Sequence, residues 1–287
     1  MAWDVRGKTV VVTGATSGIG LEASAQLAGL GAAVTMVGRD PARTSAAAAE
    51  VTRRAGSAPV TTLLCDFASQ AAIRRLASEI HERHDRLDVL VNNAGAVNKT
   101  RRVTSDGIEA TFAVNHLGYF LLTNLVTDLL TRSAPARVVT VASVGHRAGT
   151  MDFDDLGYER GYSIMKAYQR SKLGNVLFAH ELARRLADVG VTSNALHPGA
   201  VDTNIWSGAP LWARPIIALA LRPFFISAER GGERITELVA DPALEGVTGA
   251  YFEDGKRVEP APLVRDQDLA RRLWDVSEQL VGLGTHS

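Results

Sequence analysis

Two tyrosines in this chain have a lysine four residues further on, Tyr162 with Lys166 and Tyr168 with Lys172. A tyrosine can protonate the alkoxide that forms when a hydride reaches a carbonyl, provided that nearby groups stabilise its phenolate. Residues i and i+4 share one face of a helix, so the lysine ammonium can lie beside the phenol. Lowering a tyrosine pKa from about 10 to near 7 takes roughly 4 kcal/mol, and a close cation supplies much of it. The spacing indicates hydride transfer to a carbonyl or from an alcohol.

The flanking residues distinguish the two pairs. Tyr168 and Lys172 lie in YQRSK, which continues through LGNVLFAHELARRL as a long amphipathic helix, whereas Tyr162 lies at or before the start of that helix. We therefore predict that Tyr168 is the general acid and base and that Lys172 is its cation. The pair of Tyr162 and Lys166 is then accidental.

A serine, Ser143, closes the strand-like run RVVTVAS. The carboxyl ends of parallel strands form the ligand crevice of an open α/β sheet, so this hydroxyl is placed to bond a substrate oxygen. A serine after a strand is also a common helix cap or turn residue, and that alternative stays open.

A glycine-rich stretch, TGATSGIG, stands between the strand-like TVVV and the helical pattern LEASAQLAGL. The free N–H groups and the dipole of a helix N-terminus bind a pyrophosphate, and glycine allows its close approach. The spacing Gly-x3-Gly-x-Gly is a variant of the dinucleotide fingerprint, and the alternative is a turn that only packs helix against strand. The expected cofactor contacts here are Gly14, Thr16, Ser17, Gly18, Ile19 and Gly20.

Arg39 indicates which nicotinamide is bound. In dinucleotide folds a carboxylate after the second strand holds the ribose hydroxyls of NAD, whereas an arginine accommodates the 2′-phosphate of NADP. Here Gly38 and Arg39 follow that strand, so we predict NADP(H) over NAD(H), because a guanidinium fork matches a phosphate. The neighbouring Asp40 would repel a phosphate, unless it caps a helix that begins at Pro41. The alternative for Arg39 is a solvated surface arginine.

The segment Thr-Gly-x3-Gly-x-Gly resembles the opening of the short-chain dehydrogenase/reductase family, and the resemblance covers nearly the whole chain. The insertion HRAGTMDFDDLGYERGYS between Ser143 and Tyr168, the helix after Tyr168 and the NALHPG strand resemble one branch of it. That branch holds the retinol dehydrogenases, the WW-domain oxidoreductase and protochlorophyllide reductase, and it generally prefers NADP.

The resemblance assigns further roles. It implies that Lys172 binds the ribose hydroxyls, that Asn115 in TFAVNHLGYF holds a water that relays protons, and that Asp66 meets the adenine. The alternatives are a surface asparagine and a helix-capping aspartate. His197 is not expected to be catalytic, and with no second histidine at ligand spacing we predict no metal. The remaining implied cofactor contacts are Phe67, Asn93, Ala94, Gly95, Pro198, Gly199, Val201 and Thr203.

Short β-branched runs alternate with helical patterns along the chain, and they set the expected fold. The runs are TVVV, AVTMVG, VTTLLC, LDVLVN, RVVTVAS and VTSNAL, and GAYFED with a helix over 266–283 completes the pattern. Apolar strands joined by helical crossovers form a parallel sheet covered on both faces. We predict an α/β Rossmann fold, a doubly wound parallel sheet of about seven strands, as a single domain over residues 1–287.

Composition narrows the ligands and the setting. Lys plus Arg and Asp plus Glu both total 31 among 287 residues, so we expect no nucleic-acid partner and instead a small carbonyl or alcohol substrate. A single cysteine, Cys65, and the lack of an export signal or a transmembrane segment fit a cytoplasmic location. The assembly state, homo-oligomers included, stays open.

The segment 203–226 follows the cofactor stretch and contains WSGAPLWARPIIALALRPFFI. Its apolar and aromatic residues predict a substrate lid that favours lipophilic aldehydes, ketones or alcohols. The alternative is a helix packed on its own core or at a subunit contact. A different class of function, an NADP-binding regulator without turnover, is disfavoured because Asn115, Ser143, Tyr168 and Lys172 are all present.

Overall fold

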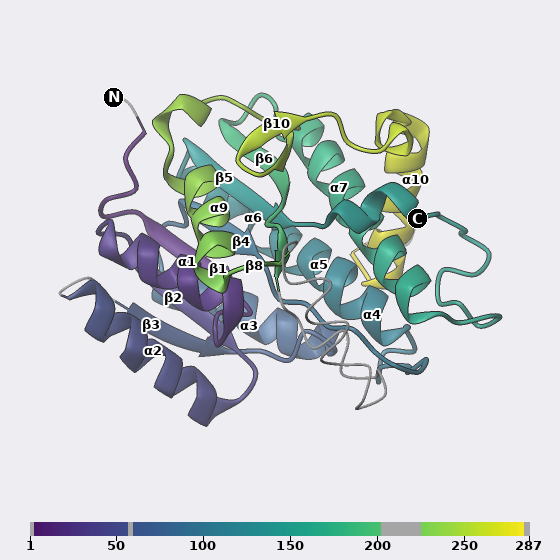
Figure 1. The fold of residues 1–287 in the computed structure, drawn as a ribbon, viewed down its shortest axis with the longest axis horizontal. Helices are drawn as coiled ribbons and strands as arrows, with labels where there is room; N and C mark the ends of the chain where they lie inside the picture. Colours follow the sequence, from purple (N-terminus) through teal and green to yellow (C-terminus); the bar gives the residue numbers. More distant parts are fainter. Residues whose placement is uncertain (1–2, 57–59, 202–224, 284–287) are drawn as a thin grey trace.

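The computed structural model describes residues 3–56, 60–201 and 225–283, which form an α/β sandwich around one main sheet (Figure 1). The β-branched runs of the sequence become its strands, and those in the centre are buried on both faces. Within the described residues the sheet has eight strands. In spatial order they are β10 (Lys256–Val258), β9 (Tyr251–Glu253), β6 (Val191–His197), β5 (Ala136–Val141), β4 (Val89–Asn92), β1 (Thr9–Thr13), β2 (Ala33–Gly38) and β3 (Val60–Leu64).

The sheet is parallel from β3 through β9, and only β10 runs antiparallel. Strand order reverses between β1 and β4, and the crevice outside the strand ends at such a reversal is where doubly wound sheets bind ligands. The predicted parallel sheet is confirmed, and its strand count is one too low. The extra strand, β10, returns from β9 through Asp254 and Gly255, which both have positive φ and form a hairpin turn.

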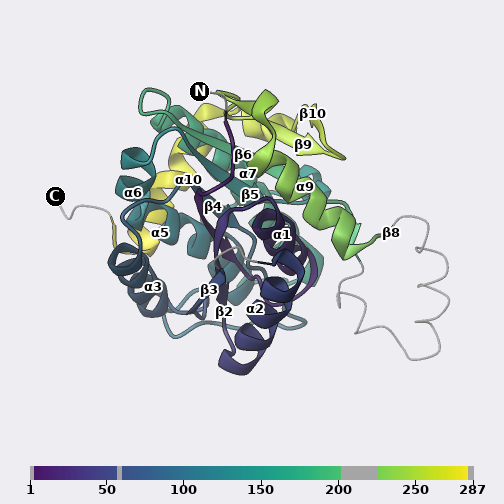
Figure 2. The same ribbon diagram turned by 90° about the vertical axis from the view of Figure 1, so that its left-hand side faces the viewer.

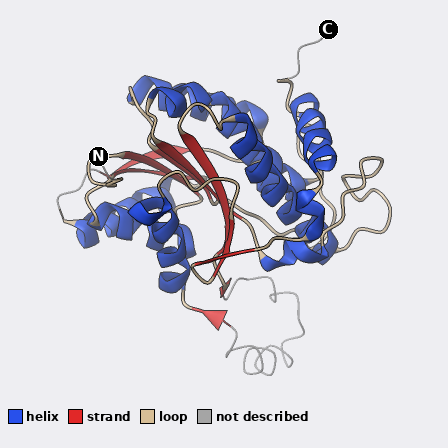
Figure 3. Cartoon of the chain, turned by 90° about the horizontal axis from the view of Figure 1, so that it is seen from above, coloured by secondary structure: helices blue, strands red, loops and turns tan. Residues whose placement is uncertain are grey.

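Helices cover both faces of the sheet (Figure 3). One face carries α1, α2 and α9 over the apolar cluster that contains Val12 and Leu196, and α1 and α9 lie side by side (Figure 2). The other face carries α3, α5, α7 and α10 over the cluster that contains Leu90 and Phe120. The bounds are α1 (Gly18–Gly29), α2 (Pro41–Ala55), α3 (Gln70–Arg83), α4 (Ala110–Phe112), α5 (Gly118–Leu125), α6 (Thr127–Arg132), α7 (Ile164–Arg185), α9 (Ala228–Ala240) and α10 (Gln267–Leu280).

Two shorter features lie near the predicted site. Strand β7 (Ala200–Val201) pairs with β8 (Phe225–Ile226) outside the main sheet. A π-helical turn, Ala113–Leu117, joins α4 to α5. Among the residues with assigned positions, no helix has both the length and the apolar character needed to span a bilayer.

Candidate active site

Helix α7 carries Tyr168 and Lys172 to the carboxyl end of β5. The Lys172 side chain is buried, and its Nζ donates to the Val141 carbonyl at 3.0 Å. The same Nζ lies 5.7 Å from the centre of the Tyr168 ring. One helical turn therefore places the phenol and the ammonium together beside the last residue of the strand.

The second tyrosine and lysine at this spacing do not form such a pair. Tyr162 precedes α7 by two residues, and its hydroxyl donates to the Asn98 carbonyl at 2.7 Å. Lys166 is exposed. This phenol is therefore held by a backbone carbonyl, while its lysine faces solvent.

Ser143 follows β5 and faces the Tyr168 ring. Its Oγ accepts a hydrogen bond from the Gly145 N–H at 3.1 Å, which leaves the hydroxyl proton available for donation. A Cβ on Gly145 would lie 3.4 Å from Ser143 Oγ and 3.5 Å from Tyr168 Cε1, so both side chains border one point in space. Ser143 is also the N-cap of the short 3₁₀ helix Val144–Ala148, so the capping role and the position at the site coexist.

Burial dominates the electrostatics of the tyrosine and lysine. It raises the pKa of Tyr168, and the hydrogen bond from Ser143 only partly opposes this. It lowers the pKa of Lys172 to about 8. Desolvation outweighs the Ser143 bond, and the Lys172 ammonium donates to the Val141 carbonyl rather than to the phenol. The lowering of the tyrosine pKa that we expect with the positively charged nicotinamide beside it stays a prediction. The phenol is protonated at neutral pH and is suited to donating a proton.

Asn115 is buried in the π-helical turn, which excludes the surface alternative. Its Oδ1 accepts from the Ala96 N–H at 2.7 Å, and its Nδ2 donates to the Ala96 carbonyl at 3.0 Å and to Ser171 Oγ at 3.1 Å. Ser171 Oγ in turn donates to the Tyr168 carbonyl at 2.7 Å. Asn115 thus ties the loop after β4 to the helical turn that carries Tyr168.

The glycine loop and the NNAG segment interlock. A Cβ on Gly14 would lie 2.6 Å from Ala94 Cα, and one on Gly20 would lie 2.5 Å from the Gly14 carbonyl oxygen. Asn93 Nδ2 donates to the carbonyls of Thr13 at 2.8 Å and Gly14 at 3.1 Å. These two glycines are needed for close backbone packing between β1, α1 and the end of β4.

Gly18 has a different reason to be glycine. Its φ is +58°, which side chains disfavour, and no atom lies within 4 Å of the point where a Cβ would stand. Ser17, the N-cap of α1, makes no side-chain capping bond. Thr16 sits against Gly38 and Ile19 packs at the edge of the core. The first turn of α1 therefore presents unsatisfied N–H groups to open space, as a phosphate site requires.

Thr13, which sequence reasoning did not identify, is fully buried beneath the loop. Its hydroxyl accepts from the N–H groups of Asn93 at 2.8 Å and Ala94 at 3.0 Å, and donates to the Val91 carbonyl at 3.1 Å. Three bonds through one hydroxyl join the ends of β1 and β4. The signal was present, since this threonine opens the TGATSGIG run.

Arg39 and Asp66 lie exposed after β2 and β3. Asp40 caps α2 by accepting from the Arg43 N–H at 2.8 Å, which resolves why a carboxylate stands beside Arg39. Asp66 does not cap α3, because Ser69 does, and its Oδ1 instead accepts from the Ala68 N–H at 3.0 Å in a turn. The helix-cap alternative for Asp66 is wrong.

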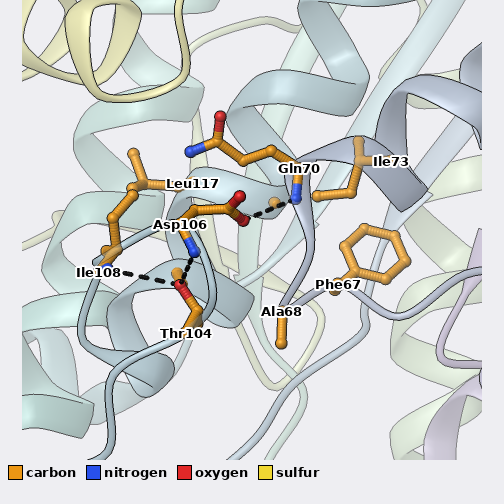
Figure 4. Close-up of a pocket in the computed structure, with 10 residues that line it drawn as sticks. Phe67, Ala68, Gln70, Ile73, Thr104, Asp106, Ile108 and Leu117 are labelled. Atoms are coloured by element: carbon orange, nitrogen blue, oxygen red, sulfur yellow. Dashed lines mark hydrogen bonds between the residues drawn. The ribbon is translucent and has the colours of Figure 1, made fainter.

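A small hollow lies beside the turn that follows Asp66 (Figure 4). Its walls come from the start of α3, the loop 104–108 and the π-helical turn that carries Leu117. The Gln70 N–H donates to Asp106 Oδ2 at 2.9 Å between the first two. Of the predicted cofactor residues only Phe67 borders it. It has room for about one water molecule, so it is not the cofactor site.

The stretch after β6 is described only in part. Pro198 and Gly199 follow the strand, and Gly199 has a φ of +105° with Ile226 packed where a Cβ would stand. Val201 belongs to β7. Thr203 and the predicted lid up to residue 224 lie outside the described residues.

Comparisons with known proteins agree with this arrangement. The family model for short chain dehydrogenases matches residues 8–213. Retinol dehydrogenase 14 of Mus musculus is 43% identical over 97% of this chain and 87% of its own length, and the WW domain-containing oxidoreductase of Homo sapiens is 40% identical over 97% and 69%.

Solved structures show the same fold. A putative uncharacterized protein from Mycobacterium paratuberculosis superposes with a TM-score of 0.80 and 32% identity over 98% of this chain and 96% of the other. An NADP complex of RhlG from Pseudomonas aeruginosa superposes with a TM-score of 0.72 and 25% identity over 88% and 96%.

Proposed function

This chain belongs to the short-chain dehydrogenase family and is an oxidoreductase of alcohol or carbonyl groups that uses a nicotinamide cofactor, and we propose that it prefers NADP(H) over NAD(H) and that Tyr168 is its general acid and base. The observation that carries the proposal is the meeting of Tyr168, Lys172 and Ser143 at the carboxyl end of β5. The hydrogen bond from Tyr162 to the Asn98 carbonyl and the exposure of Lys166 support Tyr168 over the alternative pair.

Each side chain has one task in carbonyl reduction. The nicotinamide, when bound, supplies the hydride. Ser143 gives a hydrogen bond from its hydroxyl to the substrate oxygen, and Tyr168 transfers its phenolic proton to the same oxygen. Lys172 holds positive charge beside the phenolate that remains. Asn115 fixes the helical turn of Tyr168 through Ser171. In this proposal it also holds a water that leads to Lys172 and relays protons from solvent to the phenolate.

The residues present fit a dinucleotide. The first turn of α1 is open at Gly18 and suits the pyrophosphate. Gly14 and Gly20 allow the close backbone packing that shapes this binding site. Arg39 is exposed and forms no ion pair within the described residues, so its guanidinium is placed to meet a 2′-phosphate. Asp66, Phe67, Asn93, Ala94, Gly95, Pro198, Gly199, Val201 and Thr203 complete the proposed cofactor contacts.

We further propose lipophilic substrates and a single domain over residues 1–287, with 203–226 as the lid. Val144 and Met165 are exposed apolar side chains, one next to Ser143 and the other one turn before Tyr168. Several relatives carry the name retinol dehydrogenase, which denotes a lipophilic alcohol. Apolar surface next to the reacting groups favours such substrates over small polar ones.

A substrate panel tests the proposal. Long-chain and polycyclic aldehydes, ketones and alcohols are compared with small polar carbonyls, each with NADPH or NADP and with NADH or NAD. We expect turnover with the phosphorylated cofactor, and higher kcat/KM for the lipophilic compounds. Cofactor binding without turnover on any compound would support a regulator instead, and preference for small polar carbonyls would remove the lipophilic assignment.

A further inference from the structure

His146 is a fully buried histidine directly behind Ser143. One ring nitrogen, Nε2, accepts a hydrogen bond from the Ala261 N–H at 3.0 Å. The other, Nδ1, lies 2.7 Å from the Ser143 carbonyl oxygen, which can only accept. Both nitrogens are therefore committed, and the ring must carry its proton on Nδ1.

The surroundings hold this neutral form. The ring packs against Tyr251, with centroids 4.6 Å apart, and burial lowers the pKa of His146. Protonation of Nε2 would place a second N–H against the Ala261 N–H in a site closed to water. The Ser143 carbonyl consequently always faces a donor.

The ring of His146 bonds the first backbone carbonyl beyond the pairing of β5 with β6. Just after β5, the Ala142 N–H still bonds to the Leu196 carbonyl of β6 at 2.8 Å. At the next residue, the Ser143 carbonyl is held by two bonds from His146, one from the ring and one from its backbone N–H at 3.0 Å. The ring bond ties the serine to Ala261, more than a hundred residues away in sequence.

We propose that His146 is a positioning residue, which fixes Ser143 at the substrate oxygen by donating from Nδ1 to its carbonyl. The inference rests on the proposed role of Ser143. A shift of about 1 Å in a group that bonds the reacting oxygen can lower a rate about 100-fold, so a lost anchor would appear in kcat. The His146 ring bonds Ser143 and Ala261 and none of the proposed cofactor contacts, so we expect NADPH binding to be unchanged.

Two substitutions separate the two bonds of the ring. In His146→Asn the amide N–H takes the place of Nδ1–H and keeps the bond to Ser143, but it does not reach Ala261. In His146→Gln the amide oxygen takes the place of Nε2 and keeps the bond to Ala261, but it does not serve Ser143. We expect His146→Gln to lose about 10-fold to 100-fold in kcat at unchanged NADPH affinity, and His146→Asn to stay within about threefold of wild type.

A double-mutant comparison with Ser143→Ala shows whether His146 acts through Ser143. If His146 acts through Ser143, then His146→Gln has no further effect on kcat in a Ser143→Ala background, whereas a general structural defect adds to it. His84→Gln is the matched control, since it removes a half-buried imidazole that bonds Thr35 at 3.1 Å. Its kcat should equal that of wild type.

The outcomes are distinct. Equal kcat losses in the Asn and Gln variants, or additive losses with Ser143→Ala, would overturn the inference while wild-type turnover leaves the proposed function intact. No turnover by wild type would instead count against the proposed function. If neither variant folds, nitrogen-15 NMR of wild type decides, because a proton on Nε2 rather than Nδ1 of His146 contradicts the proposed bond.

Discussion

At the scale of single residues, the Tyr-x3-Lys spacing indicates the chemistry, and the burial of the side chains distinguishes the two pairs that share it. Both tyrosines have a lysine four residues on, yet only Tyr168 has a buried one, with Lys172 Nζ 5.7 Å from its ring. Burial also raises the pKa of the phenol, a consequence that no local sequence pattern reports. A protonated tyrosine suits the reductive direction.

Cofactor choice belongs to this scale. We expect Arg39→Ser to weaken NADPH binding about 10-fold to 100-fold and to leave NADH binding unchanged, because a charge-assisted bond to the 2′-phosphate is lost. Fluorescence titration with both cofactors measures this. Arg53→Ser, at the exposed far end of α2, is the matched control. Equal weakening for NADPH and NADH would refute the assignment.

At the scale of elements, the sequence predicted what depends on neighbouring residues. The strands, the glycine loop, the Asp40 cap and the helix of Tyr168 are local patterns, and the structure has them. The sequence did not predict that Thr13 links β1 to β4. Nor did it predict that β10 is an eighth strand. Such features depend on which distant segments meet, and that is set by packing of the whole sheet.

The insertion between Ser143 and Tyr168 is recognisable in the sequence as extra length, but its attachment is not. Arg170 on α7 donates from Nε to the Thr150 carbonyl at 2.9 Å and from Nη1 to the Leu156 carbonyl at 3.1 Å, and its guanidinium lies over the Tyr158 ring. One buried arginine on α7 thus organises the insertion.

Two glycine-to-alanine substitutions on α1 test the packing of that helix. Gly20→Ala would push a Cβ into the Gly14 carbonyl and Asn93, and we expect it to destabilise the fold by about 1–3 kcal/mol and to abolish NADPH binding. Gly29→Ala meets no atom within 4 Å and should be neutral or slightly stabilising. Urea unfolding and cofactor titration read both. Normal NADPH binding by Gly20→Ala would contradict the close packing.

At the scale of the whole molecule, buried histidines make stability depend on pH. Burial lowers the pKa of His84, His146 and His197, and brings that of His116 to about 3. Unfolded histidines titrate near 6.5, so below that pH the unfolded chain binds more protons than the folded one. His81 opposes this, because the Ala77 carbonyl and Asp128 raise its pKa.

We therefore expect the free energy of unfolding to fall from pH 7 to pH 5. The contribution of these histidines is fully present above about 6.5 and is lost as pH falls toward their folded pKa values, by up to about 1.4 kcal/mol per pH unit for each proton taken up. Carboxylates whose pKa is lowered, such as Asp88, act only below about pH 4. Denaturant unfolding at several pH values measures the slope, and equal or greater stability at pH 5 would contradict the prediction.

The central claim is that Tyr168, and not Tyr162, transfers the proton. Steady-state turnover and NADPH titration of Tyr168→Phe and Tyr162→Phe test it with matched losses of one hydroxyl. We predict that Tyr168→Phe lowers kcat by about 10²–10⁴-fold while NADPH still binds, and that Tyr162→Phe keeps kcat near wild type. Near-normal turnover by Tyr168→Phe, together with an inactive Tyr162→Phe, would contradict the account.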